Sequence, residues 1–265
     1  MPRTYRVPSV ERAFQLLEEV GRAPNGMTLA EIVEQTGILK TTAFMLVSAL
    51  REMGVIAQHE AHYTLGPMLA KLGGQALRRL DLRTVAIPYM QRLVEQTGFT
   101  THLGVLSGQD LVFIDKVESD RFIQFLTYPG MTQPFYLSSL GKAVAAFLPE
   151  TEFENVVAQC HFVRKTNYTI PDAETFRQVA VTIRKQGYAT EDEENEEGVR
   201  CIGAPIFDRD GRVAAAVSVT ALRSHLPLEA FPRIATLVIA AANGISLQMG
   251  CSQPPIAAVG GGASD

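Results

Sequence analysis

Two short helical patterns follow each other closely near the N-terminus, and their spacing most constrains how this chain folds. Thr28 and Glu31 have the spacing of a capping box, and Gly37 is suited to end the helix that they begin. After a short turn, a second helix is predicted from about Lys40 to Met53. Two helices joined by so short a turn are typical of a helix-turn-helix unit.

The segments on either side of these two helices extend the pattern to a winged helix. Ser9 is predicted to cap a preceding helix with one apolar face, made of Val10, Phe14, Leu17 and Val20. Two strand patterns follow the second helix, at 55–58 and 63–65, and they predict a β-hairpin as the wing. We therefore expect residues 1–66 to form a winged helix-turn-helix domain.

The rest of the chain predicts a second, larger domain. Pro67 is suited to the first turn of a helix, so residues 67–82 are expected to form a linker helix. Residues 83–250 combine hairpin-linked strands with flanking helices, which favours an α+β domain with a largely antiparallel sheet. Residues 251–265 are rich in proline, glycine and alanine, which predicts a disordered tail.

Within the second domain, turn and cap residues locate the elements. Asp172 and Gly187 are suited to cap the two ends of one helix, and Gly211 suits a hairpin turn. The predicted strands lie at 100–106, 111–117, 122–127, 201–207 and 212–220. The predicted helices lie at 84–97, 140–147, 172–186 and 230–249.

Composition excludes several classes of protein. The chain has 265 residues, 46% of them hydrophobic, and a net charge of −4, which excludes wholesale disorder and a polybasic coat for nucleic acid. Its three cysteines lack paired spacing, and the first residues lack the apolar run of a signal peptide. The apolar stretch 234–247 is too short to span a bilayer. We therefore expect a cytoplasmic protein without a membrane partner.

Motifs of enzymes and metal sites are absent from the sequence. The segment GVLSG at 104–108 has the wrong spacing for a nucleophile elbow, and no zinc or dinucleotide motif occurs. The acidic run 191–197 lacks the spacing of an EF-hand and is expected to be a solvated loop. We expect no catalysis, no cofactor and no metal. A hydrolase that uses Cys201 or Ser218 stays open as an alternative.

Several blocks of the sequence resemble the IclR family of bacterial transcriptional regulators. In chain order these blocks are VPSVERAFQLL, TLAEIVEQTGILKTTAFMLVSALREMGVI, YTLGPMLAKLG, DLVFIDKVES, SSLGKAVAAFLP and GYATEDEENEEGVRCIGAPIFDRDGRVAAAVSVT. The resemblance implies a winged helix joined to a GAF-like effector-binding domain. It also implies a homodimer or tetramer that responds to small organic acids. The predicted function is then a ligand-responsive regulator that binds a double-stranded DNA operator.

The candidate DNA contacts gather around the second helix of the helix-turn-helix. Hydroxyls and free N–H groups at a helix N-terminus suit phosphates, and an exposed Phe44 could touch a thymine methyl group. Met45 stands where the family usually has arginine, and it cannot donate hydrogen bonds to guanine. The candidates are Thr28, Lys40, Thr41, Thr42, Phe44, Met45, Arg6 and Arg22.

Alternative readings of these residues stay open. Thr41 or Thr42 could serve only as a helix cap, and Phe44 could belong to the core. Arg6 and Arg22 could be ordinary surface residues. Because Met45 is unusual at its position, the winged helix could also bind a protein instead of DNA.

The candidate effector site lies in the second domain. Ser139, Leu140 and Gly141 begin a helix whose free N–H groups could hold a carboxylate, although an ordinary cap at Ser138 or Ser139 explains them too. Ser218 and Thr220 share one face of a strand, which suggests a pocket. The resemblance implies a site made of Ser139, Leu140, Glu191, Cys201, Ser218 and Thr220. Aromatic residues such as Phe125 and Tyr128 make an aromatic acid one candidate effector.

Overall fold

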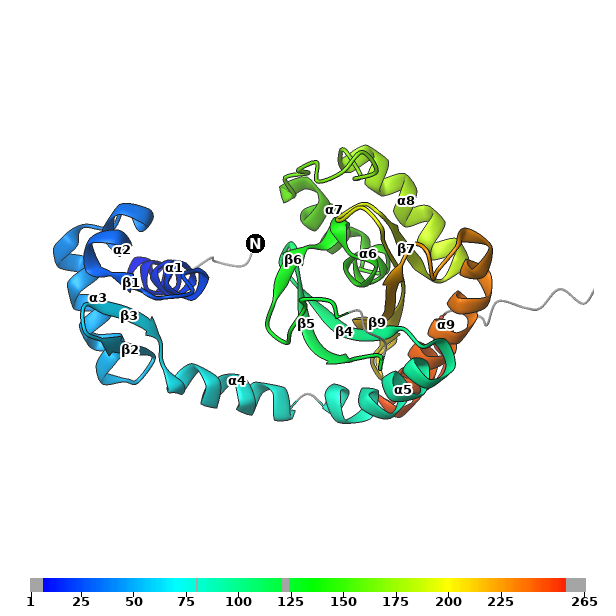
Figure 1. Cartoon of the computed structure of the whole chain (residues 1–265), viewed down its shortest axis with the longest axis horizontal. Coiled ribbons are helices and arrows are strands. Elements are labelled where there is room, and N and C mark those ends of the chain that lie inside the picture. Colours follow the sequence, from blue (N-terminus) through cyan, green and yellow to red (C-terminus); the bar gives the residue numbers. More distant parts are fainter. Residues whose placement is uncertain (1–6, 80, 121–123, 256–265) are drawn as a thin grey trace, which may run out of the picture. The chain divides into compact units, whose positions relative to one another are not determined.

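The chain folds as two compact units, Met1–Leu80 and Asp81–Asp265 (Figure 1). This computed structural model describes residues 7–79, 81–120 and 124–255. Arg6 lies outside the described residues, so its contact with DNA stays a prediction.

The first unit has the winged-helix fold that the sequence predicts. Its helices are α1 (Pro8–Arg22), α2 (Leu29–Thr36), α3 (Lys40–Glu52) and α4 (Pro67–Arg79). Its strands β1 (Met27–Thr28), β2 (Ile56–His59) and β3 (His62–Leu65) form an antiparallel sheet in the order β1-β3-β2. The predicted capping box and the left-handed Gly37 are both present around α2, so this local signal is confirmed.

Helix α1 differs from its prediction at its start and in its buried face. It begins at Pro8 with Val7 as the N-cap, so the prediction that Ser9 caps it is wrong. Leu16 and Val20 enter the core, whereas Val10 is exposed and Phe14 is 62% exposed. The helix carries two overlapping apolar sets, and packing against the core decides which of the two is buried.

The second unit is built on a six-stranded antiparallel sheet in the order β6-β5-β4-β9-β8-β7. Its strands are β4 (Thr100–Ser107), β5 (Asp110–Val117), β6 (Thr132–Pro134), β7 (Ala189–Asp192), β8 (Val199–Phe207) and β9 (Val213–Leu222). Its helices are α5 (Asp81–Thr97), α6 (Ser139–Ala146), α7 (Glu150–Gln159), α8 (Ala173–Gln186) and α9 (Phe231–Gln248). Two short 3₁₀ helices lie at Phe135–Leu137 and Leu228–Ala230. This architecture confirms the predicted α+β class.

Helices cover both faces of the curled sheet. Figure 1 shows α6 inside the curl, and the hydroxyl of Thr101 on β4 donates to Met90 of α5 on the other face. A Cβ atom at Gly203 of β8 would lie only 2.9 Å from the backbone of Ser139. Glycine at this position lets the start of α6 approach the sheet closely.

Some expected elements differ from those observed. Residues 124–127, the described part of the strand expected at 122–127, form no strand, so that prediction is wrong. Strand β6 pairs with β5 instead. Asp172 and Gly187 cap α8 as expected, and Gly211 has a φ of 73° in its turn. At the start of the expected tail, Cys251 is buried and its N–H donates to Ser246.

One described segment is long and apolar enough to cross a membrane. It spans Leu228–Gln248, which includes α9. Half of its most apolar window is buried inside the second unit. Burial of this kind is typical of a core helix, and α9 packs on β8 and α5.

Candidate functional site

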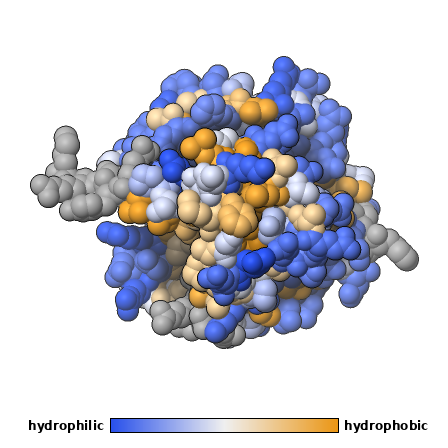
Figure 2. All heavy atoms as spheres, turned by 90° about the vertical axis from the view of Figure 1, so that its left-hand side faces the viewer, coloured by the Kyte–Doolittle hydropathy of each residue, from blue (hydrophilic) through white to orange (hydrophobic). Residues whose placement is uncertain are grey.

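The start of helix α3 presents a mixed polar and apolar surface. Its N-cap is Leu39, which has no side-chain oxygen, so neither Thr41 nor Thr42 is the cap. Lys40 and Thr41 are exposed, and Thr42 is half-buried. Phe44 and Met45 are 57% and 62% exposed, so the alternative that places Phe44 in the core is wrong. Figure 2 views the molecule from the side where α2 and α3 lie in Figure 1, and hydrophobic surface occupies the middle of that view.

Two other candidate DNA contacts already have partners within the first unit. The backbone N–H of Thr28 donates to Oε2 of Glu31 over 2.7 Å, and the Thr28 hydroxyl lies 2.8 Å from the same oxygen. Hydrogen bonds from Thr28 lower the pKa of Glu31. Arg22 at the end of α1 pairs with Glu19. Contacts from Thr28 and Arg22 to DNA stay predictions.

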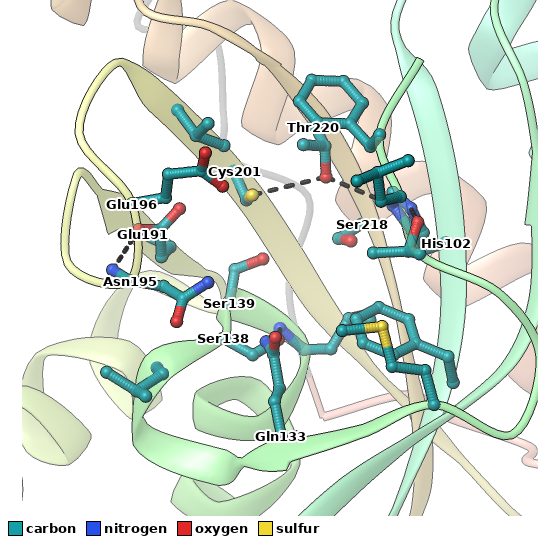
Figure 3. A pocket seen from close by; sticks show the side chains of 18 residues that line it. His102, Gln133, Ser138, Ser139, Glu191, Asn195, Glu196, Cys201, Ser218 and Thr220 are labelled. Atoms are coloured by element: carbon teal, nitrogen blue, oxygen red, sulfur yellow. Dashed lines mark hydrogen bonds between the residues drawn. The ribbon is translucent and has the colours of Figure 1, made fainter. Parts of the chain in front are cut away.

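The second unit contains a cavity of about 160 Å³ between the sheet and the start of α6 (Figure 3). Residues of strands β4, β5, β8 and β9 line it on the side of the sheet, and the loop after β7 and the segment before β6 close its sides. Its described lining is His102, Phe113, Phe125, Leu126, Thr127, Met131, Gln133, Leu137, Ser138, Ser139, Leu140, Glu191, Asn195, Glu196, Val199, Cys201, Ser218 and Thr220.

The fold brings most of the expected effector residues into this one cavity. They are Ser139, Leu140, Glu191, Cys201, Ser218 and Thr220. Gly141 does not line it, because a Cβ atom there would lie 2.4 Å from the carbonyl oxygen of Phe135 beneath α6. Ser138 is the N-cap of α6 and accepts a hydrogen bond from the N–H of Leu140.

A chain of hydrogen bonds crosses one wall of the cavity. Nε2 of His102 lies 2.7 Å from the hydroxyl of Thr127, and Nδ1 lies 3.2 Å from the hydroxyl of Thr220. That hydroxyl in turn lies 3.3 Å from Sγ of Cys201. Burial lowers the pKa of His102 to about 3, so its ring is neutral at neutral pH. The ring also meets Phe113 edge-on.

The opposite wall carries a buried carboxyl group. Glu191 is 2% exposed, and its Oε1 accepts hydrogen bonds from the backbone N–H groups of Glu194 and Asn195 at 2.7 and 3.0 Å. Burial raises the pKa of Glu191 to about 7, and this effect outweighs the lowering by the hydrogen bonds from Asn195 and Cys201 and by the charge of Lys142.

The expectation that the acidic run 191–197 is a solvated loop is wrong for its first half. Glu193 is buried and pairs with Arg223. Glu194 pairs with Lys142 of α6, which is 1% exposed. These partners come from distant parts of the chain, so the dense charges are neutralised in the fold and are not solvated.

Sequence reasoning missed His102, Lys142 and Asn195. In the structure, His102 on β4 pairs with Ser218 on β9, so the two side chains lie on the same face of the sheet. The local sign in the sequence was the polar start of the strand 100–106, made of Thr100, Thr101 and His102. Nothing in the sequence near Lys142 points to its partner, which lies 52 positions away.

The arrangement suits binding better than nucleophilic chemistry. Burial and the neighbouring Glu191 raise the pKa of Cys201, which disfavours the thiolate that a nucleophile needs. Among the described residues, no group of three or more histidine, cysteine, aspartate or glutamate residues could hold a metal ion. A small enclosed space with a few polar groups is typical of a site for a small molecule.

Comparisons with known proteins match both units. The family model described as "IclR helix-turn-helix domain" matches residues 9–60. The model described as "Bacterial transcriptional regulator IclR C-terminal" matches residues 74–247. RhmR of Escherichia coli K12, an uncharacterized HTH-type transcriptional regulator, is 30% identical over 255 residues, which cover 96% of this chain and 98% of RhmR. The E. coli regulator XynR is 32% identical, over 83% of this chain and 88% of its own.

Solved structures show the same architecture. IclR of Thermotoga maritima has a TM-score of 0.67 and 30% identity, and the match covers 91% of this chain and 98% of that one. An IclR homologue from Microbacterium hydrocarbonoxydans, solved in complex with 4-hydroxybenzoate, has a TM-score of 0.75 and 24% identity over 91% of this chain and 98% of its own. At 24% identity, this second match supports a shared fold and nothing more.

Proposed function

The chain belongs to the IclR family of bacterial transcriptional regulators, and from this premise we propose that a small organic acid in its C-terminal pocket controls how tightly it binds a DNA operator. As a member it is a DNA-binding regulator with an effector domain. The class of the effector, the residues that bind it and the residues that read DNA are our proposals.

The pocket between α6 and the sheet is the single observation that carries this proposal. Six of the residues that the sequence suggested line this pocket together, although they come from three strands, β7, β8 and β9, and from the start of α6. Its volume is about 160 Å³, and an apolar cavity of roughly 150 Å³ is large enough to hold benzene. A ligand with one ring or a short chain therefore fits this space.

The start of α6 is the part of the pocket that suits an acid. The N-terminus of a helix attracts a carboxylate through its N–H groups and its dipole. Ser139 and Ser218 flank that position, and Phe113 and Phe125 supply apolar walls for a ring. We propose Ser139, Leu140, Glu191, Cys201, Ser218 and Thr220 as the effector-binding residues.

Helix α3 is the proposed DNA-reading element. Lys40 and Thr41 are exposed at its start and are suited to phosphate contacts. Phe44 and Met45 project from the same helix and offer apolar contact to thymine methyl groups, not hydrogen bonds to guanine. We infer an operator whose central contacts depend less on guanine than those of an arginine at position 45 would.

The proposed working form is a cytoplasmic homodimer or tetramer. Val7, Val10 and Phe14 leave apolar surface exposed on α1, which supports association between copies. A dimer would place its two winged helices on half-sites one or more helical turns apart, about 34 Å or a multiple of it.

A thermal-shift screen with benzoate, 4-hydroxybenzoate and lactate tests the effector class. A ligand present at 100 times its Kd adds about 2.7 kcal/mol to the stability of the unit that binds it. We expect at least one acid to raise the Tm of the wild type, and Thr220→Val to weaken that shift. Thr236→Val, at a half-buried position of α9 outside the pocket lining, is the matched control. If none of the acids changes the Tm, the proposed effector class is wrong.

A further inference from the structure

The charges around the pocket do not match an anionic ligand. The described lining residues include the carboxylates of Glu191 and Glu196 and no lysine or arginine. The imidazole of His102 on the facing wall is neutral. An acid that enters this cavity as a carboxylate therefore meets negative charge and no positive side chain.

The buried cation whose charge acts on Glu191 is already paired with another carboxylate. Lys142 lies beneath the pocket on α6, and its ammonium group pairs with Glu194. This leaves Glu191 as the buried acid without a cation of its own, held by two backbone N–H groups. The other groups that face it are Glu196 in the same loop and the thiol of Cys201 on β8.

Two carboxylates in one poorly solvated site cannot both stay ionised without a large cost. We propose that the pocket binds its acid together with one proton, which Glu191 takes up from solvent and presents as an O–H donor to the ligand carboxylate. This inference rests on the proposed function, because it requires an acidic effector in this pocket. It makes Glu191 the residue that selects an anion over a neutral analogue.

The geometry around Glu191 permits this role. Oε1 of Glu191 accepts both backbone hydrogen bonds, so the other carboxyl oxygen can carry the proton while those bonds persist. A protonated carboxyl group has one O–H donor. Hydrogen bonds between such a donor and a carboxylate are charge-assisted and short. The loop that closes the pocket thus keeps its position when the proton arrives.

The inference predicts how ligand affinity depends on pH. With a pKa of about 7 in the free protein, Glu191 is mostly protonated at pH 6 and mostly ionised at pH 8. Binding at pH 8 should therefore take up about 0.9 proton, and binding at pH 6 about 0.1. The Kd for benzoate should rise about tenfold from pH 6 to pH 8. His102 and Cys201 stay neutral throughout this range.

Isothermal titration calorimetry with benzoate and 4-hydroxybenzoate tests this inference on the full chain. Titrations at pH 6 and pH 8, in buffers of different ionisation enthalpy, give the number of protons taken up. The wild type alone supplies this number, so the test does not depend on the folding of a variant. Benzamide, which carries no charge, should bind without proton uptake.

Glu191→Gln provides the second arm. Glutamine keeps an acceptor for the two backbone N–H groups but does not titrate, so benzoate binding should become independent of pH. Glu197→Gln is the matched control, because Glu197 belongs to the same acidic run and is exposed outside the pocket lining. It should keep the full pH dependence and the full proton uptake.

The possible failures are distinguishable. Binding of the acids without proton uptake at pH 8, or with an uptake that Glu191→Gln retains, would overturn the inference and leave the proposed function intact. If the wild type binds neither these two acids nor lactate at any pH, the proposed effector class is wrong, and this inference fails with it.

Discussion

Nδ1 of His102 and the hydroxyl of Thr220 lie 3.2 Å apart across the paired strands β4 and β9. Nε2 of the same ring meets the hydroxyl of Thr127, so a buried neutral imidazole links the sheet to the segment that closes the pocket. Protonation would place a charge on this buried ring, where it lacks the solvation by water that it has in the unfolded chain, and Lys116 would repel it. The stability of the second unit should therefore depend on pH.

The first prediction concerns His102 and acid. The pKa of His102 is about 3 in the fold and 6.5 as its ordinary value, so the unfolded chain binds more protons between these limits. The unfolding free energy should fall as pH falls through this window, by up to about 1.4 kcal/mol per pH unit. His102→Gln should remove that contribution in urea unfolding between about pH 4.5 and 7. His161→Gln, at an exposed position, should leave the pH dependence unchanged.

The second prediction concerns the buried ion pair of Lys142 and Glu194. Glu194→Gln leaves the ammonium group of Lys142 buried without its partner, which should cost about 3–5 kcal/mol in urea unfolding. Replacing both residues, as Lys142→Met with Glu194→Gln, should cost less than the single change. Glu154→Gln breaks the solvent-exposed pair with Arg177, which water and salt screen, so it should destabilise the unit far less than Glu194→Gln does. If Glu194→Gln and Glu154→Gln lower the unfolding free energy equally, the buried pair of Lys142 and Glu194 is not the more important of the two.

The third prediction concerns the cap of α2. Thr28→Ala removes the hydroxyl that accepts from the N–H of Glu31, so the first unit should lose about 1 kcal/mol. The amide of Glu31 should then exchange its hydrogen faster. Thr28→Ser keeps the oxygen and should restore slow exchange. If Thr28→Ala weakens DNA binding without changing this exchange, the hydroxyl acts on DNA and not as a cap.

The fourth prediction concerns the salt dependence of DNA binding. If Lys40 contacts a phosphate, Lys40→Ala should weaken binding to all sequences alike and reduce the slope of log K against log salt by about 1. Lys185→Ala removes an exposed lysine from the second unit and should leave the slope unchanged. A winged helix that binds protein instead of DNA would show no steep salt dependence with duplex DNA.

The sequence predicted correctly those helix caps and turns that depend only on residues close together in the chain. The capping box at Thr28, the caps of α8 and the turn at Gly211 depend on residues a few positions apart, and all three are present. On α1, Val20 is buried and Leu17 packs against the core as predicted, whereas Val10 and Phe14 are exposed. The strand expected at 122–127 is absent from residues 124–127. Tertiary packing decides which of several apolar sets is buried and which segment pairs with an edge strand.

The site was predictable where residues of one strand share a face, where a helix begins at Ser139, and where the family resemblance adds Glu191 and Cys201. Ser218 and Thr220 alternate along β9, and both line the pocket as expected. His102 was missed because its two partners, Thr127 and Thr220, are 25 and 118 positions away. The acidic run was expected in solvent because its partners, Lys142 and Arg223, are distant in the sequence and lie beside it only in the folded chain.

The central claim is that an acid in the pocket changes operator binding, and fluorescence anisotropy with labelled promoter DNA tests it most directly. The Kd for the DNA that flanks the gene is measured without ligand and with a saturating concentration of the acid that raises the Tm. A coupling of about 1–3 kcal/mol, or 5- to 150-fold in Kd, is expected for the wild type. An unchanged Kd at a concentration that saturates the pocket would contradict the account.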